Sequence, residues 1–369
     1  MSKIVYLSKS MLPSKMANSV HVMKMASAFS REGHDVTLVG KTECGSDLFD
    51  FYGMDRIFAV KVFKNSNVLL KRLNVLFFHF KSLFHVFLKR PDYIYGRNVA
   101  VCSTLILFGF KGGIELHAPL SKLNMLDYLL LRLLLLFRKK VNIFVISEAL
   151  KKIVVDEINI NNEFVCVSHD GSDPVNSLVK EGVVLHGDNT INVGYIGHLY
   201  KGRGVELLLN LAIKNPKIGF HFIGGNNEDI KYWKETASLG NIYFYGFIKN
   251  GDLDSYRDRF DALLAPYEKV VTIEGKGDTC SYMSPLKIFE YMSSGKPILC
   301  SDLSVLREVL SEKTAVLLPP EDIDAWDAAI KKLSESGGEY RERGLKAQDV
   351  FIKHYTWQVR AKNIFERLG

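Results

Sequence analysis

Short apolar runs alternate with segments whose apolar residues recur every three or four positions through most of the chain. Residues 4–7 and 36–39 are runs typical of buried strands, and between them Val20, Met23 and Ala26 have helical spacing. A strand, a helix and a strand in this order predict a parallel sheet. The first half continues with expected strands at 93–95, 113–117, 141–146 and 164–167 and expected helices near 66–89 and 98–108.

The alternation fades between Gly171 and Asn189, where proline, glycine, serine and asparagine gather, and we place a linker there. A second series follows, with strands expected at 191–196, 219–223, 242–245, 262–265, 297–300 and 314–318. At 369 residues the chain exceeds the usual reach of one hydrophobic core. We therefore expect an α/β protein with two doubly wound domains, 1–178 and 179–350, and a C-terminal helix, 351–369, that packs back on the first domain. In this architecture ligands bind in the cleft between facing strand ends.

Composition narrows the class of protein without naming a function. With 47% hydrophobic and 24% charged residues the chain is expected to be globular. The net charge of +7 suits nucleic acid, anionic lipid or phosphorylated substrates and separates none of them. The five scattered cysteines form no C-x-x-C pair, which favours reduced thiols and a cytoplasmic location. We expect no signal peptide at the start and no spanning helix, because charged residues interrupt each apolar segment.

One stretch, TCSYMSPLKIFEYMSSGKPILCSD, has the pattern of a phosphate-binding helix start. Ser284 and Pro285 suit the first turn of a helix, and Gly295 suits its end. The N–H groups and positive dipole end of such a helix attract phosphate. In its second turn, Glu290 can accept hydrogen bonds from sugar hydroxyls. The stretch therefore predicts a cradle for a nucleotide diphosphate.

A second stretch, GYIGHLYKGRGVELLL, places glycines and basic side chains between a strand and a helix. The strand is expected to end at Gly197, the loop holds His198 and Arg203, and the helix starts after Gly204. Glycines allow close backbone approach, and the Arg203 guanidinium offers a fork of donors to phosphate oxygens. An ordinary strand–turn–helix with a solvated basic loop explains the same residues equally well.

Together these two stretches resemble the retaining glycosyltransferases of family 4, whose GT-B fold has two Rossmann-like domains facing across a cleft. ELHAP (115–119), FVISEALKK (144–152) and HDGSDP (169–174) resemble that family's histidine loop, Ser-Glu helix start and Asp-Gly turn, in the family's order. The match spans nearly the whole chain and is stronger in the second half. It implies that the second domain binds a nucleotide sugar and that the first faces the acceptor.

The resemblance assigns donor-binding roles residue by residue. Arg203 falls where the family has a basic residue, usually lysine, on the donor diphosphate, and His198 falls where arginine is commoner. Glu290 matches the second glutamate of the E-x7-E pattern, which holds the ribose. The first glutamate would fall at Tyr282, a departure for which Asp278 or Glu274 could substitute. The full donor set is Gly197, His198, Arg203, Gly204, Tyr282, Ser284, Pro285, Leu286, Lys287 and Glu290.

In the first domain the resemblance points to two places. His117 matches the histidine that faces the donor sugar, and with Arg203 and Glu290 it completes the expected catalytic set. A hydrogen-bonded core histidine is the ordinary alternative for such a residue. The acceptor side is expected at Asn18, Ser19 and His21, where the family often carries Gly-Gly; Ser19 serves equally well as a plain helix cap.

The expected chemistry uses no metal and no cofactor. D-x-D occurs at Asp252–Asp254 and Asp322–Asp324, and both are interpreted as caps and first-turn charges. The resemblance implies that a helix N-terminus and basic side chains neutralise the leaving diphosphate instead. The acceptor hydroxyl then attacks from the same face, with retention of configuration.

The segment Val68 to Arg90 is basic and aromatic. Lys71, Arg72, Lys81, Lys89 and Arg90 would contact anionic lipid if this helix leaned on the inner face of the cytoplasmic membrane. A packed helix with a solvated basic face is the commoner explanation of such a pattern. No basic recognition helix or aromatic RNA-binding motif indicates a nucleic-acid partner.

The sequence thus predicts a cytoplasmic, retaining glycosyltransferase that moves a sugar from a uridine- or guanosine-diphosphate sugar to a glycan or lipid-linked glycan. A surface polysaccharide of the O-antigen or capsule type is the expected product. Two alternatives stay open: a nucleotide-sugar epimerase or hydrolase of the same fold, and a non-catalytic nucleotide-binding partner subunit. The departures at Tyr282 and His198 favour the second alternative.

Overall fold

The computed structural model describes residues 1–42, 47–64, 71–138, 140–175, 183–200, 202–270, 272–273 and 277–369. Cys44, Lys201 and Glu274 lie outside these ranges. The chain forms two compact units, one of residues 1–169 with 357–369 and the other of residues 170–356. The division between them falls earlier than the expected position after residue 178. Each unit is described below by itself.

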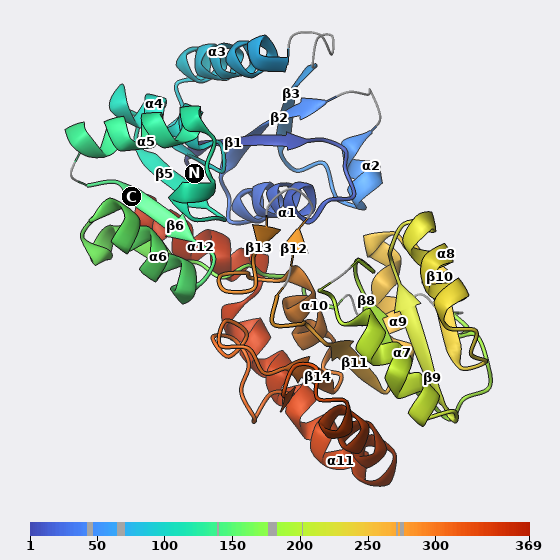
Figure 1. Ribbon diagram of the computed structural model, residues 1–369. Coiled ribbons are helices and arrows are strands. Elements are labelled where there is room, and N and C mark those ends of the chain that lie inside the picture. The colour runs from blue at the N-terminus through green and yellow to red at the C-terminus, as the bar shows by residue number, and fades with distance from the viewer. Residues whose placement is uncertain are drawn as a thin grey trace. The chain divides into compact units, whose positions relative to one another are not determined.

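Unit 1 is built on a parallel seven-stranded sheet with the order β3-β2-β1-β4-β5-β6-β7 (Figure 1). The order reverses between β1 and β4, so this sheet is doubly wound and has its switch point there. Its strands are β1 (Lys3–Met11), β2 (Asp35–Thr42), β3 (Ala59–Lys64), β4 (Tyr93–Gly96), β5 (Gly112–Leu116), β6 (Asn142–Val145) and β7 (Val165–Val167). The central strands β1 and β4 are buried almost throughout, as parallel strands covered on both faces must be.

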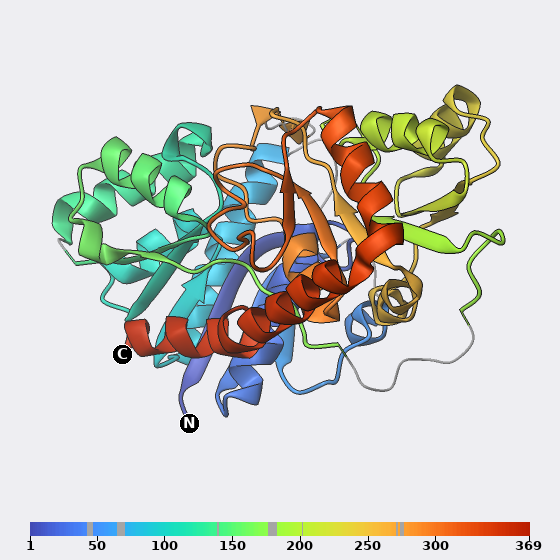
Figure 2. The same ribbon diagram turned by 90° about the horizontal axis from the view of Figure 1, so that it is seen from below.

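Helices cover both faces of this sheet. They are α1 (Ala17–Arg31), α2 (Leu48–Tyr52), α3 (Lys71–Lys89), α4 (Val99–Leu107), α5 (Met125–Phe137), α6 (Glu148–Ile158) and α12 (Trp357–Leu368). The helices α3, α4 and α5 pack in a row, with α4 in the middle. Figures 1 and 2 show α1 and α12 on the opposite side of the strands from α3.

The C-terminal helix α12 packs on α1 within unit 1. Its Phe365 ring lies 3.9 Å from the His34 ring and 5.4 Å from the Tyr93 ring, between centroids. The helical structure is interrupted at Tyr355 and Thr356, between α11 and α12, as the sequence indicates. The last thirteen residues are therefore part of the first compact unit.

Unit 2 is built on a parallel six-stranded sheet with the order β10-β9-β8-β11-β14-β15. Its strands are β8 (Ile191–Ile196), β9 (Ile218–Ile223), β10 (Ile242–Gly246), β11 (Ala262–Ala265), β14 (Ile298–Ser301) and β15 (Val316–Leu318). A separate antiparallel pair joins β12 (Thr272–Ile273) to β13 (Gly277–Asp278). The switch point of the main sheet lies between β8 and β11.

The helices of unit 2 are α7 (Val205–Lys214), α8 (Asn227–Thr236), α9 (Leu253–Arg259), α10 (Leu286–Ser294) and α11 (Ile323–His354). Trp326 of α11 is fully buried in a core that also contains Phe220 and Phe222 of β9. Asp322 caps α11 by accepting a hydrogen bond from the Ala325 N–H at 3.0 Å. This confirms the cap assigned to the second D-x-D pair.

Three local expectations differ from the structure. The sequence pattern missed α2 and β3, because β3 alternates apolar residues with lysine and is only half-buried. Ser19 does not cap α1: the cap position is Met16, and the Ser19 hydroxyl donates to the carbonyls of Ser14 and Met16 at 2.7 Å.

Within the described part of the chain, no helix combines the length and apolar content that a membrane crossing needs.

Candidate functional site

Two cations of unit 2 lie together at the switch point of its sheet. Lys287 is on the first turn of α10, and Arg203 is on the loop between β8 and α7. The Lys287 Nζ lies 4.0 Å from the ring centroid of Tyr195, which is near the end of β8, and 4.9 Å from that of Tyr267, which follows β11. The Arg203 guanidinium lies 5.7 Å from the Tyr267 ring. Aromatic faces from two neighbouring strand ends therefore hold both cations through cation–π contacts.

We call Arg203, Lys287, Tyr195 and Tyr267 the aromatic box, and no carboxylate among the described residues neutralises its two basic side chains. Among the described residues neither Arg203 nor Lys287 pairs with a carboxylate within 4.0 Å; Arg203 instead donates from Nη2 to the Tyr200 hydroxyl at 2.7 Å. Desolvation, and next the charge of Arg203, holds the pKa of Lys287 well below its usual range. The buried Nε of Arg203 and hydroxyl of Tyr267 also find no hydrogen-bond partner among the described residues. Such a site gains free energy when an anion enters it.

Glycines make this close arrangement possible. A Cβ on Gly197 would lie 3.1 Å from the Lys287 Nζ, so the lysine rests against the backbone at the end of β8. Gly204 has φ +71°, and a Cβ there would lie 1.7 Å from the Pro266 carbonyl oxygen. Only glycine fits that position without moving the backbone. The sequence signal at Gly197 and Gly204 is thus explained by contacts with β11 and α10.

His198 lies at the surface of the same loop. Its ring is 5.1 Å from the Tyr200 ring, and its carbonyl accepts a hydrogen bond from the Tyr195 hydroxyl at 2.6 Å. Partial desolvation, followed by the charges of Arg203 and Lys287, lowers the pKa of His198. Of these two residues, Arg203 therefore carries the permanent positive charge.

Helix α10 begins next to these cations. Its cap position is Pro285, which provides no side-chain hydrogen bond, so the first backbone N–H groups of α10 are not capped by that residue. The Ser284 hydroxyl instead accepts from the Asp170 N–H at 3.1 Å. The helix is fixed by Tyr291, whose buried hydroxyl accepts from the Ile196 N–H at 2.9 Å. Pro285, Leu286 and Lys287 thus form the start of α10 in unit 2, and their role in a phosphate cradle stays a prediction.

Glu290 is on the second turn of α10 and is partly exposed. Its Oε2 lies 3.4 Å from Nη1 of Arg257, a residue of α9 that sequence reasoning did not select. Arg257 bonds more closely to Asp254, at 2.6 Å from its Nη2. The weak contact leaves the second carboxylate oxygen of Glu290 outside this ion pair. Asp254 is a first-turn charge, as expected for the first D-x-D pair.

Tyr282, which stands in place of the family's first glutamate, is buried. Its N–H donates to the Thr279 carbonyl, so the backbone here forms a turn before α10. Of the two carboxylates considered as substitutes, Asp278 is exposed and accepts a hydrogen bond from the Cys280 N–H at 2.9 Å. Glu274 lies outside the described residues. The structure therefore offers no carboxylate at position 282.

Unit 1 contains a buried polar cluster around Glu115, at the end of β5. The carboxylate accepts hydrogen bonds from the Tyr95 hydroxyl and pairs with His117. His21 of α1 lies 3.2 Å from Oε1, and Nη2 of Arg360, on α12, lies 3.1 Å from the same oxygen. Arg360 also donates from Nε to the His169 carbonyl at 2.9 Å. Three elements distant in sequence thus meet at one carboxylate.

The charges of this cluster compensate each other. Burial alone would raise the pKa of Glu115, but the charges of Arg360, His21 and His117 hold it well below its usual range. Since an ionised carboxylate only accepts hydrogen bonds, Nε2 of His117 carries the proton. His21, Glu115 and His117 are residue types that bind metals and lie close together. Because Arg360 occupies the carboxylate, we interpret them as a hydrogen-bonded network.

The expected acceptor residues behave differently from one another. Asn18 is exposed on the first turn of α1. Ser19 is buried and bonded within its own turn, and His21 is buried against Glu115, with its ring 5.2 Å from Trp357. Of the three, Asn18 alone presents its side chain to solvent. His21 belongs with the network that orients His117.

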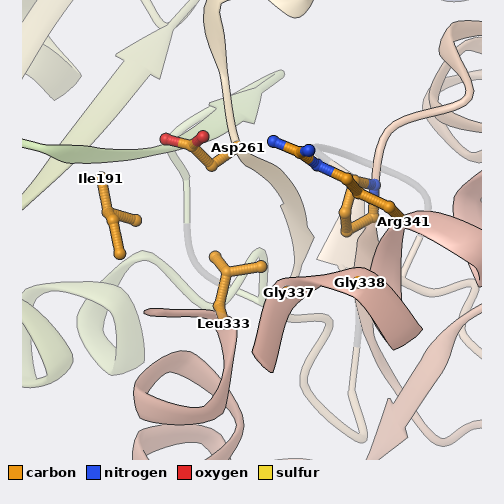
Figure 3. A pocket seen from close by; sticks show the side chains of 7 residues that line it. Ile191, Asp261, Leu333, Gly337, Gly338 and Arg341 are labelled. Carbon is orange, nitrogen blue, oxygen red and sulfur yellow. The ribbon is translucent and has the colours of Figure 1, made fainter. Parts of the chain in front are cut away.

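Two hollows of unit 2 bear on where a phosphate group could bind. One of about 890 Å³ lies at the carboxyl ends of the strands and is lined by Tyr200, Gly204 and Trp233 together with several carboxylates. Those carboxylates, Glu268 among them, disfavour phosphate there. The other, of about 270 Å³, lies at the amino ends of the strands between Asp261, Leu333 and Arg341 (Figure 3). The cation pair at Arg203 and Lys287 is therefore the better place for a diphosphate.

Sequence reasoning missed the residues that position this chemistry. Tyr195, Tyr267 and Tyr291 form or fix the aromatic box, and Arg360 completes the Glu115 cluster. Tyr195 stands inside an apolar strand run, Tyr267 follows one, and Tyr291 belongs to the apolar pattern of α10. In all three places a tyrosine is indistinguishable from a core residue by sequence. A buried arginine on a polar C-terminal helix carries no local signal of its partner.

A family model places this arrangement among known proteins. Residues 190–336 match the family described as Glycosyl transferases group 1. The matched residues all lie in unit 2. The chain is 23% identical over 251 residues to an uncharacterized glycosyltransferase, MJ1069, of Methanocaldococcus jannaschii, covering 63% of this chain and 60% of that protein. It is also 23% identical over 158 residues to the O-antigen biosynthesis glycosyltransferase WbnH of Escherichia coli, covering 43% of this chain and 42% of that protein.

Solved structures show the fold. Sucrose-phosphate synthase from Thermosynechococcus elongatus matches all of this chain with a TM-score of 0.75 at 15% identity, covering 98% of that chain. HepE of Anabaena, in complex with UDP and glucose, also matches all of this chain, with a TM-score of 0.72 at 15% identity over 99% of its length. The expected fold class is confirmed: the chain has two Rossmann-like domains of the GT-B type. The chain spans about 60% or less of the length of these curated relatives.

Proposed function

We propose that this protein is a retaining glycosyltransferase that moves a sugar from a nucleotide-diphosphate sugar to a glycan or lipid-linked glycan. One observation carries the proposal: Arg203 and Lys287 form an unneutralised pair of cations beside the start of α10, at the switch point of the unit 2 sheet. A diphosphate supplies the missing negative charge. The Glycosyl transferases group 1 match over residues 190–336 supports the same reaction class.

In this proposal Arg203, Lys287 and the N–H groups of α10 stabilise the diphosphate as it leaves the sugar. Two side-chain cations and a helix terminus provide charge compensation without a metal. Glu290, on the second turn of the helix, accepts hydrogen bonds from the ribose hydroxyls with the carboxylate oxygen that Arg257 does not contact. His117, held by Glu115, faces the donor sugar, and the acceptor hydroxyl attacks the face from which the diphosphate departs.

The proposed acceptor is a glycan of the cell surface or its lipid-linked precursor, and the proposed donor base is uracil or guanine. WbnH, one of the similar proteins, is named for O-antigen biosynthesis, and HepE was solved with UDP and glucose. We place the reaction in the cytoplasm, at the inner face of the cytoplasmic membrane, where a lipid-linked acceptor would be reached. Asn18 and the first turn of α1 would lie on the acceptor side.

A thermal-shift screen tests donor binding. A nucleotide that binds only the folded protein raises its melting temperature, so UDP, GDP and their sugars are compared. Arg203→Ala and Lys287→Ala should each remove the shift given by the preferred nucleotide, whereas Arg307→Ala, which removes a surface cation paired with Asp302, should keep it. Normal shifts in the first two variants would reject the site.

A second candidate, a non-catalytic nucleotide-binding subunit, is favoured by the buried Tyr282 at the position of the family's first glutamate. The two proposals differ in turnover. Incubation of the preferred nucleotide sugar with a panel of lipid-linked and soluble glycans should release nucleoside diphosphate in step with the glycosylated product if the protein is an enzyme. Binding without any release across the panel supports the subunit, and release without glycosylation indicates a hydrolase.

A further inference from the structure

The positive charge of the whole protein comes from one segment. Residues 71–140 contain 12 lysines and arginines and three acids, a balance of +9, so the other residues together balance to −2 against the total of +7. The three acids are Asp92, Glu115 and Asp127. Glu115 and Asp127 are buried, and Asp92 accepts a hydrogen bond from the Lys3 backbone. This segment forms α3, α4 and α5 of unit 1.

The same segment exposes an unusual amount of apolar surface. Fourteen of the 25 large apolar side chains that are exposed among the described residues lie between positions 75 and 137. Exposed apolar residues scattered singly are ordinary, but a gathered set marks an interaction surface. Phe80 and Phe84 of α3 are 65% and 66% exposed, and Leu136 and Phe137 of α5 are 79% and 74% exposed.

The exposed apolar residues form stripes that point away from the core. On α3 the inner stripe is Phe78, Ser82 and Val86, all buried, and Phe80 and Phe84 occupy the opposite side of the helix. On α5 Leu131 and Leu134 are buried, whereas Leu129, Leu133 and Leu136 are exposed at helical spacing. Both helices flank α4, so both stripes face outward from one layer of helices.

The ends of the three helices lie near one another. The Phe87 ring of α3 lies 5.8 Å from the ring of Phe108, which follows α4. Gly109 in turn lies beside Arg138 at the end of α5, with 4.0 Å between an added Cβ and Nη2. The exposed residues Phe80, Phe84, Phe87, Phe108, Leu136 and Phe137 are called the α3–α5 face below.

Exposed cations border this face. Lys81 and Lys89 of α3 and Arg132 and Arg138 of α5 are exposed, and no carboxylate among the described residues pairs with them. Arg90 is exposed as well, while the side chains of Lys71 and Arg72 lie outside the described part of the chain. Asp92, which accepts a hydrogen bond from the Lys3 backbone, is the exposed acid of residues 71–140. Apolar side chains bordered by a large excess of cations match an anionic bilayer: the apolar groups enter the acyl boundary and the cations meet lipid phosphates.

We propose that the α3–α5 face docks unit 1 on an anionic phospholipid membrane. The sequence left open whether basic residues of 68–90 contact lipid or form a solvated helix face; the structure adds an exposed apolar surface from two helices and the loop after α4. The inference rests on the proposed function only in that a lipid-linked acceptor is reached at a membrane. Donor binding in unit 2 is measured separately, so either proposal can fail alone.

Vesicle flotation tests the docking surface. The wild-type protein should float with vesicles of phosphatidylcholine and phosphatidylglycerol at 7:3 and far less with phosphatidylcholine alone. The double variant Phe80→Ser/Phe84→Ser should lower the partition coefficient about tenfold or more, because two aromatic side chains no longer enter the membrane. Its matched control, Leu345→Ser/Ile352→Ser, removes two similarly exposed apolar residues from α11 and should float like the wild type.

Charge variants test the border of the face. Lys81→Glu/Lys89→Glu should lower partitioning about tenfold or more, whereas Lys362→Glu/Arg367→Glu on α12 should have little effect. At 0.5 M salt binding should weaken and persist in part, since the apolar contribution is not screened. The proposal is rejected if the folded wild-type protein does not bind anionic vesicles, or if the Phe80→Ser/Phe84→Ser variant floats as the wild type does. The proposal is also rejected if light scattering shows that the wild-type protein is a dimer and the serine variant is a monomer, since a second copy of the chain then covers the face.

Discussion

The Arg360 Nη2 of α12 lies 3.1 Å from the Glu115 Oε1 of β5, and this ion pair joins residues 245 positions apart. Both side chains are almost completely buried. The pair therefore ties the last helix of the chain to the sheet of unit 1 and at the same time fixes the carboxylate that holds His117. One arginine serves the packing of α12 and the orientation of the proposed catalytic histidine.

Loss of Arg360 should destabilise unit 1 strongly. Arg360→Gln leaves the Glu115 charge buried with a weaker partner, and breaking a buried pair costs about 3–5 kcal/mol of unfolding free energy. Arg367→Gln, an exposed arginine of the same helix, should stay within about 0.5 kcal/mol of the wild type. Chemical denaturation measures both. Equal stabilities of the two variants would show that the contact contributes little.

The same pair predicts the response to acid. The pKa of Glu115 is lower in the folded protein than in the unfolded chain, so its stabilising contribution is complete above the unfolded value near 4.3. That contribution is lost as pH falls from about 5 through the lowered pKa. Glu115→Gln should therefore lose less stability than the wild type between pH 5 and pH 3. A parallel decline of the two unfolding free energies would contradict this account.

Replacement of Lys287 should weaken nucleotide binding without lowering the stability of the protein. Its positive charge is desolvated among Tyr195, Tyr267 and Arg203, so Lys287→Met should keep or raise the stability of the ligand-free protein. The same change should weaken UDP or GDP binding about tenfold or more, because a charge-assisted contact is lost. Thermal unfolding and calorimetry provide the two measurements. A destabilised variant with unchanged affinity would remove Lys287 from the donor site.

Binding of the nucleotide should take up protons. Because burial lowers the pKa of Lys287, the free folded protein binds fewer protons there than the unfolded chain does between the lowered pKa and the usual value near 10.4. The stability of the ligand-free protein therefore rises with pH across that interval. A bound diphosphate favours the protonated, charged form of Lys287, so the affinity for the nucleotide should fall as pH rises across the same interval. Calorimetry in buffers of different ionisation enthalpy measures the uptake, which Lys287→Met should abolish.

The fold could be predicted further than the site could. The alternation of buried runs with helical spacing located twelve of the strands, because parallel strands covered on both faces appear in the sequence as continuous apolar runs. The apolar pattern did not predict β3, because this strand lies at the sheet edge and its exposed lysines interrupt the apolar run. Motif spacing led to Arg203 and Lys287, but the shared box of tyrosines depends on strand neighbours that local sequence does not specify.

Position-specific roles in the first unit were harder to predict. Ser19 follows the pattern of a helix cap, yet α1 starts two residues earlier and its hydroxyl bonds inside the first turn. His117 was selected by its family position, and the structure adds its cause, a carboxylate fixed by Arg360 and Tyr95. Contacts between residues hundreds of positions apart decide such roles, so a single sequence does not reveal them.

Glu290 should separate recognition of the ribose from recognition of the phosphates. Glu290→Gln keeps the size of the side chain and weakens hydrogen bonds to ribose hydroxyls, so affinity for UDP or GDP should fall about tenfold or more. Affinity for inorganic pyrophosphate should stay nearly unchanged, whereas Arg203→Ala should lose both ligands. Calorimetric titration gives the four constants. A Glu290→Gln variant that loses both equally would indicate that this residue acts by holding Arg257 and not by contacting ribose.

A substitution at Gly204 tests whether the anion site needs the present path of the loop between β8 and α7, which carries Arg203. Gly204→Ala adds a Cβ that would lie 1.7 Å from the Pro266 carbonyl oxygen, at a φ of +71° that disfavours alanine. Backbone strain and overpacking together should cost about 2 kcal/mol or more of unfolding free energy. Relief of the clash requires the loop to move from β11, which carries Arg203 away from Tyr267 and should weaken pyrophosphate binding. Gly251→Ala, with open space around the added methyl group, is the matched control. If Gly204→Ala keeps normal pyrophosphate affinity while losing stability, the anion site does not depend on the contact between the loop and β11.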